Sequence, residues 1–240
     1  MAEWRPPKVF MNTKEMTIIN ELSESVSNLY YQGKYEEMCD KCKELINLNP
    51  ENSWAYTCWG IALDNLANLK RNGDIFIDAC GKYTKAIEIK PDDHDTWYNW
   101  GNALAGLAKL KGDESLFEQA RFKFEQAIKI NPDDYDAYSG VAATLLYTAQ
   151  FKAKTPKYQS LLKQAEEKAL KAESLQKGSG AYNLACVYAL KNDKDSCKKW
   201  LLIGQETNTL QTREHAMKDI DFENMKNEPW FKKIKWKGEK

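Results

Sequence analysis

The chain has 240 residues, of which 35 are lysine or arginine and 35 are aspartate or glutamate, so its formal net charge is zero. A neutral chain has no overall field that would attract nucleic acid or an anionic membrane, and no apolar run approaches the length that spans a bilayer. The first residues lack the features of a signal peptide, and the six cysteines lie inside helical patterns. We therefore expect reduced thiols, a cytoplasmic location, no nucleic acid partner and no membrane insertion.

The chain begins with a short segment that shows no helical periodicity. We expect residues 1–18, which contain Pro6 and Pro7, to form an N-terminal extension. A first helical hairpin is predicted at 19–52, because Gly33 stands where a turn is needed and Pro50 closes the second helix.

The next two hairpins, predicted at 53–93 and 94–134, repeat one pattern of residues. Six pairs share an offset of 41 positions (100 − 59 for the first): Trp59 and Trp100, Gly60 and Gly101, Ala79 and Ala120, Tyr83 and Phe124, Ala86 and Ala127, and Pro91 and Pro132. A fixed period of this size indicates stacked helical units that bury their apolar faces against one another.

Two further hairpins keep parts of the pattern. The hairpin predicted at 135–177 lacks the closing proline, and the hairpin predicted at 178–205 is shorter. Residues 206–240 are expected to form a C-terminal cap with a basic tail. We expect a short amphipathic helix from Asp219 to Met225, with Phe222, Trp230 and Phe231 covering the open end of the stack.

The repeated pattern resembles the tetratricopeptide repeat (TPR), whose units have roughly 34 residues and carry an aromatic residue, Leu-Gly, Ala, an aromatic residue, Ala and Pro. The resemblance covers residues 19–205 and implies an all-α fold: a right-handed α-solenoid of about five TPR-like helical hairpins with a C-terminal capping helix. The central repeats are predicted to be longer than the standard unit, because leucines continue the first helix before each glycine stop.

The resemblance also implies a binding groove, since the first helix of each TPR unit lines the concave face. The positions that match the family pattern, and that we expect to bind a protein or peptide partner, are Trp54, Thr57, Tyr98, Asn99, Asn102, Ser139, Tyr182 and Asn183. Asn99 and Asn183 match the asparagine with which family members hold a ligand's backbone amide.

The sequence gives little support for binding of chaperone tails, for metal binding or for catalysis. The carboxylate clamp of chaperone-binding TPR proteins needs lysine or arginine, and the matching positions hold none, so we do not expect binding of chaperone tails. Cys39 and Cys42 stand mid-helix, and the two histidines, His94 and His215, show no ligand spacing. We expect no enzyme activity, no cofactor and no metal site.

The sequence thus predicts a protein–protein interaction scaffold or adaptor that binds a peptide segment or a partner domain in its groove. The alternative is a dedicated chaperone or assembly factor for one client, which would use the same groove transiently. Sequence alone leaves open the partner, the pathway, the oligomeric state and whether the N-terminal segment occupies the groove.

Overall fold

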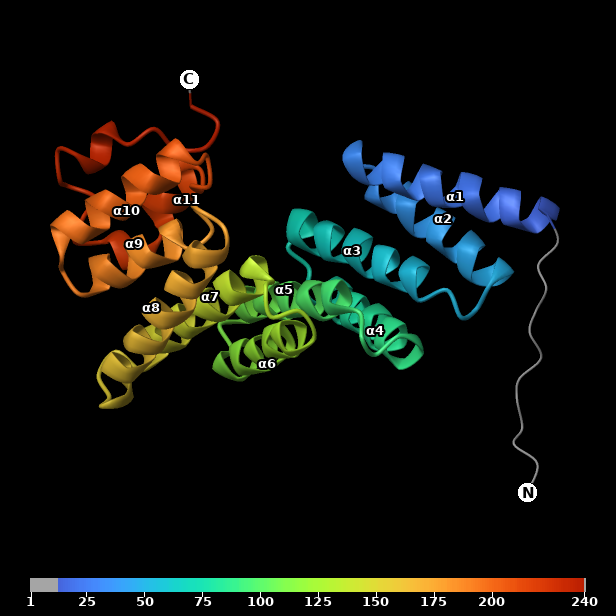
Figure 1. The fold of residues 1–240 in the computed structure, drawn as a ribbon, viewed down its shortest axis with the longest axis horizontal. Helices are drawn as coiled ribbons and strands as arrows, with labels where there is room; N and C mark the ends of the chain where they lie inside the picture. Colours follow the sequence, from blue (N-terminus) through green and yellow to red (C-terminus); the bar gives the residue numbers. More distant parts are fainter. Residues whose placement is uncertain (1–12, 240) are drawn as a thin grey trace. The chain divides into compact units, whose positions relative to one another are not determined.

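The computed structural model describes residues 13–239, and this part of the chain is built from helices joined by turns and loops (Figure 1). It contains eleven α-helices and two short 3-10 helices, and residues 13–239 include no strand. The predicted all-α class is therefore confirmed. The structure divides into two compact units, one ending at Pro91 and one beginning at Asp92, which we describe separately.

The first unit consists of two antiparallel hairpins in chain order. Its helices are α1 (Thr13–Tyr31), α2 (Tyr35–Leu48), α3 (Ser53–Lys70) and α4 (Gly73–Ile89). Each helix packs against the next, and α1 also contacts α3. Residues 13–18, which we expected in the N-terminal extension, form the first turns of α1; residues 1–12 lie outside the described part of the chain.

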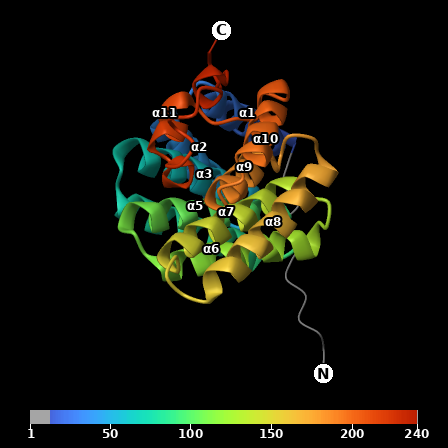
Figure 2. The same ribbon diagram turned by 90° about the vertical axis from the view of Figure 1, so that its left-hand side faces the viewer.

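The second unit continues the same arrangement and adds a C-terminal segment. Its helices are α5 (His94–Lys111), α6 (Glu114–Ile130), α7 (Tyr135–Phe151), α8 (Lys157–Leu175), α9 (Ala181–Leu190), α10 (Lys194–Glu206) and α11 (Arg213–Lys218). From α5 to α10 each helix packs against the next, and the first helices of successive hairpins, α5, α7 and α9, also contact one another in turn. Figure 2 turns this unit toward the viewer.

Helix ends follow local side-chain chemistry. The side chain of Asn52 accepts a hydrogen bond from the backbone N–H of Ala55 at 3.0 Å, and Asp134 does the same for Ala137 at 2.9 Å, so each satisfies a free donor at a helix start. Gly112 ends α5 with φ of 63°, a left-handed conformation that glycine adopts without strain.

Small residues let the two helices of a hairpin approach closely. A Cβ added to Gly101 on α5 would lie 2.7 Å from Cε1 of Phe124 on α6, and one added to Gly140 on α7 would lie 2.8 Å from the same atom. The Phe124 ring therefore fills the space between its own hairpin and the next, as its place in the repeat predicts. Ala120, which is fully buried, contributes a second small residue on α6.

Lysines on the second helix of each repeated hairpin lie over tryptophans on the first. Nζ of Lys82 is 3.8 Å from the Trp59 ring centroid, and Nζ of Lys123 is 3.4 Å from that of Trp100. Both lysines and both tryptophans are 41 residues apart (123 − 82 and 100 − 59). These cation–π contacts tie the two helices together and recur with the repeat.

The C-terminal segment folds back on the last hairpin, with η1 (Ile220–Phe222) against α9 (Figures 1 and 2). Of the three aromatic residues expected to cover the end of the stack, Phe222 and Phe231 are almost fully buried and Trp230 is only partly buried; Trp236, which was not part of that expectation, is also almost fully buried. The helix expected from Asp219 to Met225 is absent from this segment: α11 ends earlier, and the Asp219 side chain accepts from the N–H of Asp221 to begin the short η1 turn.

None of the helices within residues 13–239 is both long and apolar enough to cross a membrane.

Candidate functional site

A hollow of about 730 Å³ runs along the first helices of the hairpins in the second unit. It is bounded by α5, α7 and α9, by the loop between α8 and α9, and by the segment between α10 and α11; we call it the groove. Five residues that the sequence analysis placed in a binding groove line it: Tyr98, Asn102, Ser139, Tyr182 and Asn183. Their role in binding remains a prediction.

Two of these side chains are already engaged inside the protein. The amide of Asn183 donates to the backbone oxygen and to Oγ of Ser139, both at 3.0 Å, and so joins α9 to α7. The hydroxyl of Tyr182 donates to Asp219 at 2.8 Å. Because the side-chain NH₂ of Asn183 donates both hydrogen bonds to Ser139, Asn183 helps to position α9 against α7.

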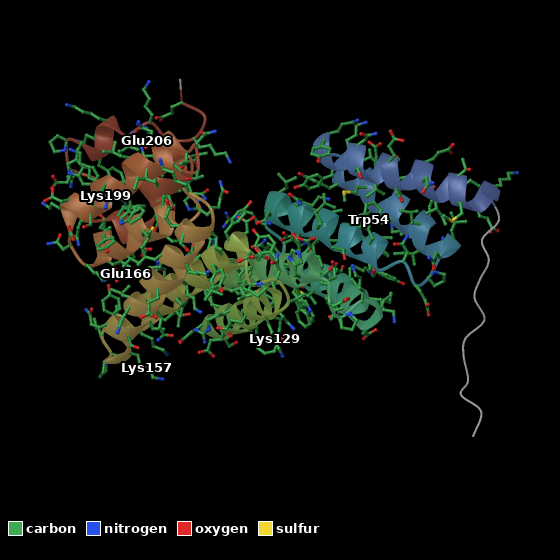
Figure 3. All side chains as sticks on the ribbon, viewed as in Figure 1. Trp54, Lys129, Lys157, Glu166, Lys199 and Glu206 are labelled. Atoms are coloured by element: carbon green, nitrogen blue, oxygen red, sulfur yellow. The ribbon has the colours of Figure 1, made fainter. Side chains whose placement is uncertain are left out.

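The remaining predicted residues lie elsewhere. Asn99 is not among the residues that line the groove, and its amide donates to the backbone oxygen of Asp95 at 2.8 Å. Thr57 is 6% exposed, and its hydroxyl donates to the backbone oxygen of Ser53, so its side chain is hydrogen-bonded within α3. Trp54, labelled in Figure 3, lines a separate hollow of about 210 Å³ in the first unit, together with Tyr30 and Tyr31.

The groove carries negative charge where α7 begins. Asp136 lines it, and the pKa of Asp136 is raised by the loss of solvent and, less strongly, by the neighbouring carboxylate of Asp134. Burial also raises the pKa of Tyr98, which keeps its hydroxyl neutral. Lys177 stands on the loop between α8 and α9, which lines the same groove. The wall beside Tyr98 and Asp136 thus offers an aromatic face next to a carboxylate.

Two segments of the groove wall, residues 176–179 and 207–211, contain none of the predicted binding residues. The carboxylate of Glu173 holds the first, accepting from the backbone N–H of Gly178 at 2.9 Å and of Gly180 at 3.2 Å. Gly178 has φ of 94°, and a Cβ there would lie 2.2 Å from Oγ1 of Thr207. The two segments therefore lie close together, which no repeat period could have indicated.

A second cavity, of about 180 Å³, adjoins one end of the groove and shares Tyr182 and Asn183 with it. We call it the end cavity. Its polar lining includes Lys109, Cys186, His215, Asp219 and Asp221. Burial, followed by the nearby Asp219 carboxylate, raises the pKa of Asp221 to about 7.

Known proteins share this sequence pattern and this architecture. A family model described as "Plant specific mitochondrial import receptor subunit TOM20" matches residues 33–204. A search of the curated proteins finds no match.

Several solved structures share the fold at low sequence identity. MamA of Desulfovibrio magneticus RS-1 is 18% identical, with a TM-score of 0.57 over 84% of this chain and 97% of that chain. TTC0263, a thermophilic TPR protein of Thermus thermophilus, is 17% identical, with a TM-score of 0.55 over 85% and 94%. YrrB, a TPR protein with an unusual peptide-binding site, is 15% identical, with a TM-score of 0.52 over 80% and 91%. The fold is therefore the TPR α-solenoid that the repeat pattern predicted.

Proposed function

Because the chain belongs to the family of the plant-specific mitochondrial import receptor subunit TOM20, we propose that it is a receptor for proteins that are imported into mitochondria. As a TPR protein of a receptor family, it is a scaffold for protein interactions. The finer proposal is that the groove of the second unit binds one segment of each imported protein. No catalytic step is part of this function.

The chemistry of the groove supports a particular kind of segment. Mitochondrial targeting segments are amphipathic, rich in arginine and serine, and poor in acidic residues. The rings of Tyr98 and Tyr182, with Ala143 between them in the lining, would take the apolar face of such a segment. Asp136 would take a lysine or arginine from its basic face. The aromatic wall next to this carboxylate is the observation on which the proposal depends.

The proposed place of action differs from the location expected from sequence. An import receptor works at the mitochondrial surface, whereas the composition suggested a free cytoplasmic protein. We propose that the protein acts at that surface with the groove facing the cytoplasm, where the imported proteins are made available to it.

The proposal can be tested by fluorescence anisotropy with a labelled amphipathic peptide that carries arginine and serine and no acidic residue. The control peptide has the same composition in an order that destroys the amphipathic pattern. We expect the first peptide to bind at least about tenfold more tightly. Only its residue order places apolar groups on one face and basic groups on the other, to match the aromatic rings and the carboxylate of the wall. We expect Tyr98→Ala and Asp136→Asn each to weaken this binding.

Asp133→Asn is the matched control, because Asp133 is exposed, lies three residues from Asp136 and does not line the groove. Equal binding of the two peptides would contradict the receptor proposal. If the protein instead prevented aggregation of an unfolded client without preference for such a segment, the alternative of a dedicated chaperone or assembly factor would be favoured.

A further inference from the structure

The end cavity brings together three side chains whose donor atoms suit a metal ion. Sγ of Cys186 and carboxylate oxygens of Asp219 and Asp221 all lie within 4.8 Å of one another. Cys186 is 2% exposed and Asp221 is 6% exposed, so these groups are largely withdrawn from water. The three residues come from two separate places: Cys186 lies on α9, whereas Asp219 and Asp221 lie just before and within η1.

The two carboxylates receive only part of the compensation that buried negative charge requires. Asp219 accepts from the Tyr182 hydroxyl at 2.8 Å, from the backbone N–H of Asp221 at 3.0 Å and, in a longer contact, from the Cys186 thiol at 3.9 Å. Asp221 accepts from the Gln150 amide at 2.9 Å. These donors are all neutral. Lys109 lines the same cavity, but its Nζ lies 4.6 Å from the centroid of the Tyr147 ring, over the face of that ring.

The same hydrogen bonds leave room for a metal and orient its ligands. A carboxylate has two oxygens with about four lone-pair sites, so each aspartate keeps sites beyond those used by Tyr182, Gln150 and the backbone. Outer groups that hold ligating carboxylates in place are a regular feature of metal sites. Tyr182 holds the carboxylate of Asp219 in this way, and Gln150 holds that of Asp221.

From this geometry we propose that Cys186, Asp219 and Asp221 bind a zinc ion, with its fourth coordination position facing the end cavity. A thiolate beside two carboxylates suits zinc, whereas magnesium and calcium prefer oxygen ligands alone. The cavity of about 180 Å³ has space for water at the fourth position and gives the ion a path of entry. His215, one helical turn before Asp219, lines this cavity as well.

No metal site was predicted from the sequence, because the three ligands do not stand at one of the short spacings typical of metal sites. Here Cys186 is separated from Asp219 by 33 positions, and the fold brings them together. Bound zinc would fix the turn between α11 and η1 to α9, at the end of the groove. The metal site shares Tyr182 with the groove but involves neither Tyr98 nor Asp136, so the variants that test the two proposals are different.

The full-length protein, stripped of metal with a chelator, should be titrated with Co²⁺ as a spectroscopic substitute for zinc. We expect one ion per chain, a thiolate-to-cobalt charge-transfer band, and displacement of cobalt by Zn²⁺. Cys186→Ser should remove the band, and Asp221→Asn should lower the affinity by at least about tenfold. Gln150→Leu should lower it by about 10–100-fold, as loss of an outer-shell partner does elsewhere.

Cys80→Ser is the matched control and should keep both the band and the affinity, since Cys80 stands on α4 in the first unit. Asp221→Asn has the shape of the native residue and can still accept from Gln150, so it tests the site even if Cys186→Ser fails to fold; circular dichroism checks each variant. Absence of the charge-transfer band in the native protein would overturn the proposal. So would equal affinity of Asp221→Asn, or a band that survives Cys186→Ser in a folded protein.

Discussion

The ring of Tyr83 lies so close to Gly60 that a Cβ added to the glycine would sit 2.5 Å from Cε1 of the tyrosine. The same relationship recurs 41 residues later, between Gly101 and Phe124. The two copies differ by one hydroxyl group. Among residues 13–239, the buried Tyr83 hydroxyl has no hydrogen-bond partner, so the first copy contains a polar atom that the second one avoids.

We predict that Tyr83→Phe stabilises the protein. A buried polar group without a partner costs about 1–3 kcal/mol, and phenylalanine has the same ring without that group. The free energy of unfolding, measured by urea denaturation, should rise by about 1 kcal/mol. Phe124→Tyr is the reciprocal change and should lower it. A loss of stability in Tyr83→Phe would mean that the hydroxyl is hydrogen-bonded in solution.

A second prediction concerns the close approach of α5 and α6. Gly101→Ala should destabilise the protein by about 1–3 kcal/mol, because the new methyl group would meet the Phe124 ring at 2.7 Å and force it to move. Gly81→Ala is the matched control. Gly81 is exposed in the middle of α4, and a Cβ there would meet nothing within 4 Å, so alanine should stabilise that helix by up to about 1 kcal/mol. Equal effects of the two changes would contradict the packing argument.

These glycines also show why so much of the fold could be predicted. A glycine opposite an aromatic ring, repeated at a fixed offset, identifies a helix crossing from sequence alone, because no other residue type permits the contact. The start of α1 was less predictable. Its first turns carry no repeated residue and residues 14–18 are exposed, so the repeat pattern did not indicate a helix there, although Asn12 and Glu15 have the spacing of a helix-capping pair.

The sequence predicted residues of the candidate site only within the repeated hairpins. Tyr98, Asn102, Ser139, Tyr182 and Asn183 line the groove because the period places them on the first helices of their hairpins. The sequence could not show that both NH₂ bonds of Asn183 go to Ser139. Nor could it place Thr207 and Asp219, which follow the last repeat and reach the site through contacts between distant parts of the second unit.

A third prediction concerns pH. Burial raises the pKa of Asp64 on α3 from 3.8 to about 7, and the Asn68 amide, which donates to it, offsets only part of this effect. Between these two values the folded protein holds a proton that the unfolded chain has released. The free energy of unfolding should therefore decrease as pH rises from about 4 to about 7, and the contribution of Asp64 should stay low above that range.

Asp64→Asn should remove this dependence, because asparagine stays neutral at every pH. Urea denaturation at a series of pH values should show the variant to be more stable than the native protein at pH 8, by about 1–3 kcal/mol, with a smaller or no advantage at pH 4. Asp78→Asn, at an exposed position on α4, is the control for removing one negative charge from the same unit. A constant difference across the pH series would show that Asp64 is not responsible.

The last prediction concerns the C-terminal segment, which packs on the last hairpin through its aromatic residues. Phe222 is fully buried, and its ring centroid lies 5.5 Å from that of Tyr182, a groove residue on α9. Phe222→Ala should cost about 3–5 kcal/mol, since it removes a large buried ring and leaves a cavity. Because Tyr182 loses a neighbour, peptide binding in the groove should weaken at temperatures where the variant is still folded.

Ile220→Ala provides the control, because Ile220 belongs to the same short helix η1 and is 62% exposed. It should change the free energy of unfolding by less than about 0.5 kcal/mol and leave peptide binding unaltered. Thermal unfolding followed by circular dichroism, together with anisotropy of the bound peptide, separates the two effects. If Phe222→Ala lowered stability but left binding unchanged, the C-terminal segment would stabilise the last hairpin without shaping the groove.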